Sequence, residues 1–200
     1  MTPDELRIPA TEQHEATVIF LHGLGEINES WRATIQGLSR QLPKIKWILP
    51  QATSKPVTFN QGRSRPNWFD IATLPPGEAE WDGVGIAQSM STVESIIQAE
   101  VHAGIDSRKV VLVGFSQGAA LGLAVALTTL HELGGVASLS GWIPHRAREV
   151  TSSLPVSSAS DNVLTVPLID SKLSIPNPIF RFFADMEGMM KKYRLLIPRR

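Results

Sequence analysis

The chain contains no cysteine in its 200 residues, which excludes disulfides and thiol chemistry and fits a reducing compartment. It also lacks an excess of either charge, because 19 Lys and Arg residues are matched by 19 Asp and Glu residues. No basic run occurs before residue 180. The sequence therefore carries no electrostatic signature for nucleic acid or an anionic membrane, and small or neutral partners are expected.

Long hydrophobic runs are absent as well. The longest nearly apolar run, 118–127, is too short to span a bilayer, and the opening MTPDELRIPATEQHE is polar and acidic, unlike a signal peptide. The five histidines do not cluster at ligand spacings, so neither a metal site nor a cofactor is predicted. These features predict a cytoplasmic protein without an integral membrane segment, and 42% hydrophobic residues are enough for a single domain with one core.

Strands and helices are predicted to alternate as far as Pro144. Apolar runs rich in β-branched residues predict strands over 16–23, 45–50, 109–116 and 134–144. Apolar residues at helical spacing, or a run of small residues, predict helices over 31–42, 79–104 and 117–133. Because such crossovers are right-handed, the pattern predicts an α/β fold with a mostly parallel sheet and helices on both faces.

Residues 51–78 carry Pro, Gly and Asn without a hydrophobic period. A loop of this length is uncommon in a compact domain unless it serves function. The segment is therefore predicted to be a loop at the substrate site.

Ser116 lies in a G-x-S-x-G pentapeptide, directly after the strand KVVLVGFS and before a helix rich in small residues. A sharp turn between strand and helix lifts such a serine above the sheet, and the glycines at 114 and 118 make room for the turn. Ser116 is the predicted nucleophile. The alternative is a plain strand-turn-helix in which the serine is incidental.

The segment LHGLGE, residues 21–26, follows another predicted strand. Acyl transfer needs N–H donors aimed at the developing oxyanion, and glycines let the backbone come close to it. Leu24 and Gln117, the residue after the nucleophile, are the predicted donors. His22 precedes Ser116, against the usual order of Ser, Asp and His, and is expected to orient the backbone through a hydrogen bond. The alternative for this segment is an ordinary turn.

Four motifs, LHGLGE, KPVTFNQGRSRPNWFDI, GFSQGAALGLA and LSGWIP, together resemble the acyl-protein thioesterase family, the phospholipase/carboxylesterase group of α/β-hydrolases. The resemblance covers roughly 14–148. It implies an α/β-hydrolase fold, hydrolysis of acyl thioesters or carboxylic esters, and acylated proteins, lysophospholipids or small acyl esters as substrates. It further implies that Pro66, Trp68 and Phe69 border the acyl site. Trp142 is expected to pack in the core near the site, and Glu26 stands where the family usually has Asp.

The acid and base of the family's catalytic triad are not found in this sequence. The histidines after Ser116 are His131, expected at the surface near the end of a helix, and His145, which no motif supports as a base. The aspartates are Asp161, Asp170 and Asp185, and neither Asp185 nor the neighbouring Glu187 has the family's His-Gly before it. Without a base a serine is weakly reactive, so two readings stay open: an impaired serine hydrolase, or a relative that binds acyl groups or proteins without turnover.

The composition changes after residue 149. The segment 150–175 is serine-rich and has no convincing period, and 176–200 holds most of the basic excess, so these are described as an atypical insert and an aberrant tail of the one domain. Read from the third base of the Arg181 codon, the genetic code permits HGRDDEEVP, which fits the family's missing acid segment. We hypothesise truncation, or a frame shift beyond about Ile175 with a retained intron within 151–171. An uninterrupted transcript across codons 150 to 185 that encodes the same residues would contradict it.

Overall fold

The structure is a computed structural model that describes residues 4–74, 76–77, 82–143 and 163–165. All of them belong to the first of two units into which the chain divides, Met1–Thr165 and Val166–Arg200. The predicted tail 176–200, and most of the predicted insert 150–175, lie outside the described residues.

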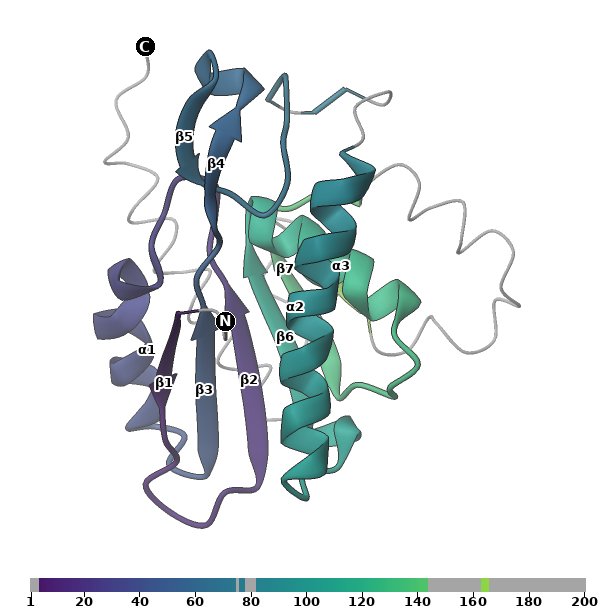
Figure 1. The fold of residues 1–200 in the computed structure, drawn as a ribbon. Helices are drawn as coiled ribbons and strands as arrows, with labels where there is room; N and C mark the ends of the chain where they lie inside the picture. Colours follow the sequence, from purple (N-terminus) through teal and green to yellow (C-terminus); the bar gives the residue numbers. More distant parts are fainter. Residues whose placement is uncertain (1–3, 75, 78–81, 144–162, 166–200) are drawn as a thin grey trace, which may run out of the picture. The chain divides into compact units, whose positions relative to one another are not determined.

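A six-stranded sheet with the order β1-β3-β2-β6-β7-β8 forms the centre of the first unit (Figure 1). Four of its strands match the predicted ones: β2 (Ala16–Leu21), β3 (Ile45–Pro50), β6 (Val110–Phe115) and β7 (Gly135–Leu139). These four are parallel to one another. Their burial is nearly continuous, as expected for strands that are covered on both faces.

Three helices connect the parallel strands: α1 (Arg32–Ser39), α2 (Gly83–His102) and α3 (Gln117–Thr128). Short 3₁₀ turns accompany them, η1 (Asn28–Trp31) before α1 and η3 (Ser107–Lys109) before β6. The chain moves from β2 to β3 in one direction, and then from β3 past β2 to β6 and β7 in the other. Because the crossovers are right-handed, this reversal places α1 on one face and α2 and α3 on the opposite face (Figure 1).

The predicted loop 51–78 is not wholly irregular. It contains a hairpin of β4 (Ser54–Val57) and β5 (Arg63–Pro66), antiparallel and joined through η2 (Thr58–Asn60). Gln61 and Gly62 both have positive φ, 58° and 74°, which lets the chain reverse. Sequence reasoning missed the hairpin because two prolines and mostly exposed side chains leave no alternation of apolar and polar residues.

Both edges of the sheet carry a strand that the sequence did not predict. At one edge, β1 (Glu5–Ile8) is antiparallel to β3 and has only Leu6 and Ile8 buried. At the other, β8 (Val163–Thr165) pairs in parallel with β7. No strand was predicted after Pro144, but the short run at 163–165 extends the sheet by one strand.

Helix ends follow local side-chain chemistry. Asp82 caps α2 by accepting the Gly85 N–H at 2.9 Å, and the predicted stop at Gly104 is confirmed by its φ of 96°. α3 ends at Thr128, five residues before the predicted end at 133. The Thr128 hydroxyl donates to the Ala124 carbonyl at 2.8 Å, and Thr129 already has an extended backbone.

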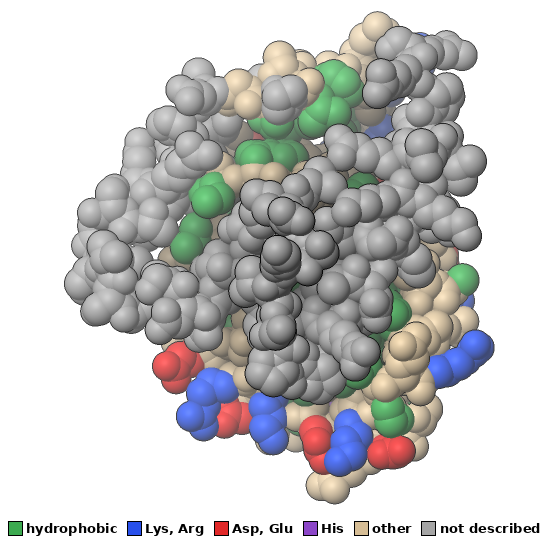
Figure 2. Space-filling model, turned by 180° about the vertical axis from the view of Figure 1, so that it is seen from behind, with side chains coloured by type: hydrophobic (Ala, Val, Ile, Leu, Met, Phe, Trp, Pro, Cys, Tyr) green, Lys and Arg blue, Asp and Glu red, His purple; other side chains and the backbone are tan. Residues whose placement is uncertain are grey.

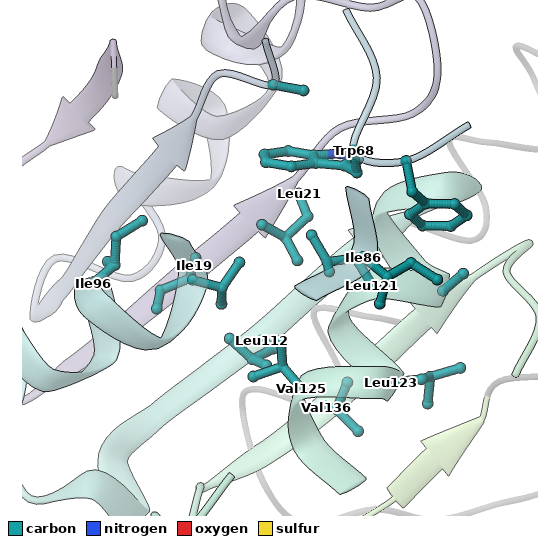
Figure 3. Packing of buried hydrophobic residues seen from close by; sticks show 14 of the residues in the cluster. Ile19, Leu21, Trp68, Ile86, Ile96, Leu112, Leu121, Leu123, Val125 and Val136 are labelled. Atoms are coloured by element: carbon teal, nitrogen blue, oxygen red, sulfur yellow. The ribbon is translucent and has the colours of Figure 1, made fainter. Parts of the chain in front are cut away.

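The core lies between the sheet and the pair α2 and α3. Leu21 and Leu112 from the sheet, Ile86 and Val93 from α2, and Leu121 from α3 are all buried in it (Figure 3). The apolar positions predicted for the helix over 79–104 thus face the core, with Met90 and Val101 partly buried at its margin.

Opposite charges are mixed on the described surface. Figure 2 views the molecule from the side opposite to Figure 1, and it shows Lys and Arg side chains next to Asp and Glu side chains along the lower rim. Exposed ion pairs include Lys44 with Glu15 at 2.6 Å and Arg108 with Asp106 at 2.6 Å. No helix within the described part of the chain combines the length and the apolar character that crossing a membrane requires.

Candidate active site

The candidate site lies where the direction of the crossovers reverses. β2 and β6 are direct neighbours in the sheet, with Leu21 paired to Gly114 near their carboxyl ends. The chain leaves β2 toward one edge of the sheet and leaves β6 toward the other. In open α/β sheets, ligands bind in the crevice at such a switch point. The two segments that follow these strands are the ones in which the sequence predicted catalytic groups.

Ser116 occupies the turn between β6 and α3. Its φ of 53° and ψ of −116° lie outside the regions that non-glycine residues normally adopt, and such strain is held in place only by surrounding contacts. The Ser116 N–H donates to the Leu139 carbonyl of β7 at 2.8 Å, and its own carbonyl accepts the N–H groups of Ala119 and Ala120. Ser116 is therefore fixed between a strand and the first turn of a helix.

Glycines at both sides of Ser116 allow this close packing. A Cβ atom on Gly114 would overlap the backbone of Gly118 and Ala119. A Cβ atom on Gly118 would lie 2.5 Å from the His22 carbonyl oxygen and nearer still to that of Leu21. The first turn of α3 thus rests directly on the end of β2, and this brings the two predicted catalytic segments together.

His22 holds the loop after β2. It is 1% exposed, and its Nε2 accepts the Ala52 N–H at 3.1 Å, so the proton of the neutral ring is on Nδ1. Nδ1 donates to the Gly23 carbonyl at 2.8 Å. Burial lowers the pKa of His22 and outweighs the bond to Gly23, which keeps the ring neutral. The predicted backbone-orienting role of His22 agrees with this geometry.

The carbonyl that His22 holds belongs to the same peptide unit as the Leu24 N–H. Because the unit is planar and trans, the N–H points away from the His22 ring. Leu24 itself is partly buried against the core. Gln117 is the first residue of α3, and an N–H in the first turn has no acceptor within its helix. Both predicted donors therefore lie in segments that converge beside Ser116.

Glu26 closes the same loop. Its carboxylate accepts the Gly23 N–H at 2.8 Å and the Trp31 indole N–H at 3.0 Å. The Gly25 N–H, at a φ of 78°, donates to the Pro66 carbonyl at 2.8 Å. The loop after β2 is thus tied to its own flank and to the end of the β4–β5 hairpin.

The three residues predicted to border the acyl site lie at the end of this hairpin. Pro66 is partly buried, while Trp68 and Phe69 are 2% and 4% exposed. Trp68 lies near Leu21 above the strand ends, and its indole N–H donates to the His22 carbonyl at 2.8 Å (Figure 3). Trp142 meets the edge of Phe69 with ring centroids 6.1 Å apart, so its predicted packing near the site is seen. Pro66, Trp68 and Phe69, called the aromatic wall below, lie beside the loops that follow β2 and β6.

The remaining candidates for acid and base are not brought to Ser116 in the described structure. His131 lies beyond the far end of α3, where it forms a 3.5 Å pair with Glu94. His145, Asp161, Asp170, Asp185 and Glu187 lie outside the described residues. Within the described part of the chain, no residue forms a hydrogen bond with the Ser116 hydroxyl, and no group of three or more His, Asp or Glu side chains has the arrangement to hold a metal ion.

Comparison with known proteins identifies the family. The sequence model of the family described as Phospholipase/Carboxylesterase matches residues 5–159. The chain belongs to this family. This chain is 43% identical over 141 residues to acyl-protein thioesterase 1 of Cryptococcus neoformans. The alignment covers 70% of this chain and 59% of the Cryptococcus protein. This chain is also 41% identical to acyl-protein thioesterase 1 of Yarrowia lipolytica, again covering 70% of this chain and 62% of that one.

The structural comparison agrees with the family assignment. Acyl-protein thioesterase 2 of Zea mays superimposes with a TM-score of 0.66 at 31% identity, covering 76% of this chain and 69% of that one. The fold is an α/β-hydrolase fold, as predicted. The chain spans 59% and 62% of the length of the two fungal relatives, so what their complete chains do is not assigned to it by similarity alone.

Several residues that shape the site were not foreseen. Asp82, the cap of α2, and Ser89 of α2 form hydrogen bonds with the Trp68–Asp70 segment, and the Gln117 side chain of α3 forms another. Asp82 precedes a helix and is a capping residue by type, so the sequence signalled it. The partners of Ser89 and Gln117 are distant along the chain, and no local pattern could reveal them.

Proposed function

We propose that this chain carries the nucleophile and oxyanion hole of a serine hydrolase that cleaves acyl thioesters or carboxylic esters. The observation that carries the proposal is the backbone of Ser116, strained at a φ of 53° in a turn between strand and helix. Such strain persists where function requires a side chain to be presented, and it supports a hydroxyl directed toward the two proposed N–H donors. The enzymatic names of the fungal relatives agree with this reading.

The proposed reaction passes through an acyl-enzyme. The Ser116 oxygen attacks the acyl carbonyl carbon, the C=O electron pair moves to the oxygen, and the hydroxyl proton passes to a base. The N–H groups of Leu24 and Gln117 stabilise the resulting oxyanion. Collapse of the intermediate breaks the bond to sulfur or oxygen, and the leaving group takes a proton. Water then cleaves the acyl-enzyme by the same steps and releases the carboxylic acid.

The aromatic wall supports acyl groups as the substrate class. Pro66, Trp68 and Phe69 form an apolar lining beside the loops that carry the proposed donors, and an apolar lining with few polar groups suits an acyl chain. An acylated protein, a lysophospholipid or a small acyl ester presents such a chain. The names of the relatives, acyl-protein thioesterase 1 and 2, favour thioesters of acylated proteins among these.

A fluorophosphonate probe tests the proposal, because it phosphonylates only a serine that is activated for attack. We expect covalent labelling of the 200-residue chain, slowed because no triad acid or base is found in its sequence, mapped to Ser116 by mass spectrometry and abolished in Ser116→Ala. Ser140→Ala is the matched control, since Ser140 also has a positive φ, 55°, but lies at the end of β7. Labelling in this control should persist.

Absence of labelling in the intact chain would contradict the enzymatic proposal. In that case the chain is better described as an acyl-binding or protein-binding relative, and the sequence, in which no His-Gly precedes Asp185, favours this second function. Saturable binding of a non-hydrolysable acyl thioether, weakened in Trp68→Ala, would support it.

A further inference from the structure

The side chain of Gln117 links the nucleophile turn to the aromatic wall. It is 0% exposed. Its Oε1 accepts the Trp68 N–H at 3.0 Å, and its Nε2 donates to the Phe69 carbonyl at 2.7 Å. One amide group therefore satisfies a donor and an acceptor on the backbone of neighbouring residues, 48 and 49 positions away along the chain.

The wall has no strand partner where Gln117 meets it. β5 ends at Pro66, so Trp68 and Phe69 belong to no strand of either sheet. Buried backbone groups need partners, and here the primary amide of Gln117 supplies the pair of bonds that a neighbouring strand would otherwise make. Gln117 therefore supplies two backbone hydrogen bonds that tie the wall to α3.

Other elements hold the same segment from different sides. The Ser89 hydroxyl of α2 donates to the Trp68 carbonyl, and the Asp70 N–H donates to the Asp82 carboxylate at 2.8 Å. The Trp68 indole binds the His22 carbonyl after β2. Among these contacts, the two hydrogen bonds of Gln117 are the ones that come from the residue directly after Ser116.

We infer that the Gln117 side chain is a positioning residue that couples the aromatic wall to the nucleophile turn. The part of this inference that concerns Ser116 reactivity rests on the proposed function. The backbone N–H of Gln117 is the proposed oxyanion donor, while its side chain fixes Trp68 and Phe69. Any shift of the wall is therefore transmitted to the donor.

Two substitutions separate the hydrogen bonds from the volume of the side chain. Gln117→Glu has nearly the same shape, but its carboxylate cannot donate to the Phe69 carbonyl. When this carboxyl group is protonated, it regains one donor and resembles the glutamine amide. Burial raises the pKa of such a carboxyl group toward the interval between pH 5 and pH 7.5 in which the test is made. Gln117→Met fills the space and forms neither bond at any pH. Gln88→Glu, on the exposed face of α2, is the matched control for the same chemical change.

Hydrogen exchange provides the direct test. We compare protection factors of the Trp68 amide, and of Ala119 and Ala120, whose N–H groups bond to the Ser116 carbonyl. At pH 7.5 both Gln117 variants should lose protection at these amides by about tenfold or more, because Gln117→Met forms neither bond and repulsion between the introduced carboxylate of Gln117→Glu and the Phe69 carbonyl moves the side chain away from the Trp68 amide. At pH 5 the protection factors of Gln117→Glu should recover, and those of Gln117→Met should not. The protection factors of Gln88→Glu should equal those of the unsubstituted chain at both pH values.

Fluorophosphonate labelling of Ser116, as a ratio to the original chain at each pH, should follow the same pattern. Equal protection of Gln117→Glu and Gln117→Met at both pH values would overturn the inference, as would loss at Trp68 without loss at Ala119 and Ala120. If the original chain is not labelled at all, the proposed function fails, and the exchange data still decide the coupling. If exchange behaves as expected but labelling of the variants is unchanged, the wall does not control Ser116.

Discussion

Replacing Gly118 with alanine should lower the free energy of unfolding by about 3 kcal/mol, at the upper end of the usual cost of overpacking. The added methyl group would lie 2.5 Å from the His22 carbonyl oxygen and closer to that of Leu21. These are backbone atoms in and directly after a central strand, so they cannot move aside as a flexible side chain could. α3 would have to separate from β2, and urea denaturation followed by circular dichroism measures the loss.

Gly122 provides the control within the same helix. A Cβ atom there would lie 3.6 Å from the Leu21 side chain, which is an ordinary contact. Gly122→Ala should therefore raise stability by up to about 1 kcal/mol, since alanine favours helix more than glycine does. If alanine were tolerated equally well at 118 and 122, close contact between α3 and the end of β2 would not be required for folding.

The second large effect is expected at a buried ion pair at the opposite end of the sheet. Lys46 of β3 lies 2.5 Å from Glu100 of α2, and the carboxylate also accepts the Thr17 hydroxyl at 2.7 Å. Lys46→Met leaves the Glu100 side chain, which is 3% exposed, without the lysine ammonium group. We expect a loss of about 2–3 kcal/mol, below the ~3–5 kcal/mol of fully buried pairs because 21% of the lysine side chain is exposed.

The effect of Lys46→Met should depend on pH. Burial alone would raise the pKa of Glu100, but hydrogen bonds from Lys46 and Thr17 outweigh it, so this pKa lies below its ordinary value. A carboxyl with a lowered pKa stabilises the fold above its unfolded pKa, and this contribution is lost as pH falls through the folded value. Without Lys46, burial dominates and the pKa rises, so the variant loses stability as pH increases. The difference between the two proteins should therefore shrink below about pH 4.

Urea titrations from about pH 3 to about pH 8 measure this difference. The double substitution Lys46→Met with Glu100→Gln removes both charges and keeps an acceptor for Thr17, so it should recover most of the stability. Lys44→Met breaks the exposed pair with Glu15 and should have almost no effect. A double variant as unstable as Lys46→Met would show that an unpaired buried charge is not the cause.

The sequence predicted the strands that are buried on both faces of the sheet. β2, β3, β6 and β7 are buried on both faces, so a continuous apolar run identified each of them. The β4–β5 hairpin and β8 are short, and they depend on turn geometry or on a neighbouring strand that no local pattern encodes. Element position was therefore predictable wherever burial was complete.

The same distinction applies to the site. Ser116, Leu24 and Gln117 were proposed because their motifs are contiguous, with glycines where the backbone must approach another segment. The side-chain amide of Gln117 acts through partners 49 and 48 residues away, which only the tertiary fold brings to it. Residue type alone could not reveal such roles, because a glutamine in a first helical turn is usually solvated.

The direct pairing of β2 with β6 has a further consequence for how such a site can diversify. Both proposed oxyanion donors follow strands whose register is set by Leu21 opposite Gly114, whereas the aromatic wall follows a separate hairpin. Residues can be inserted at the hairpin tip, 58–62, without altering that register. The strand register that positions the two donors is therefore independent of the hairpin tip, and hairpins of other lengths can be grafted there to change acyl preference as long as the Gln117 bonds to Trp68 and Phe69 are kept.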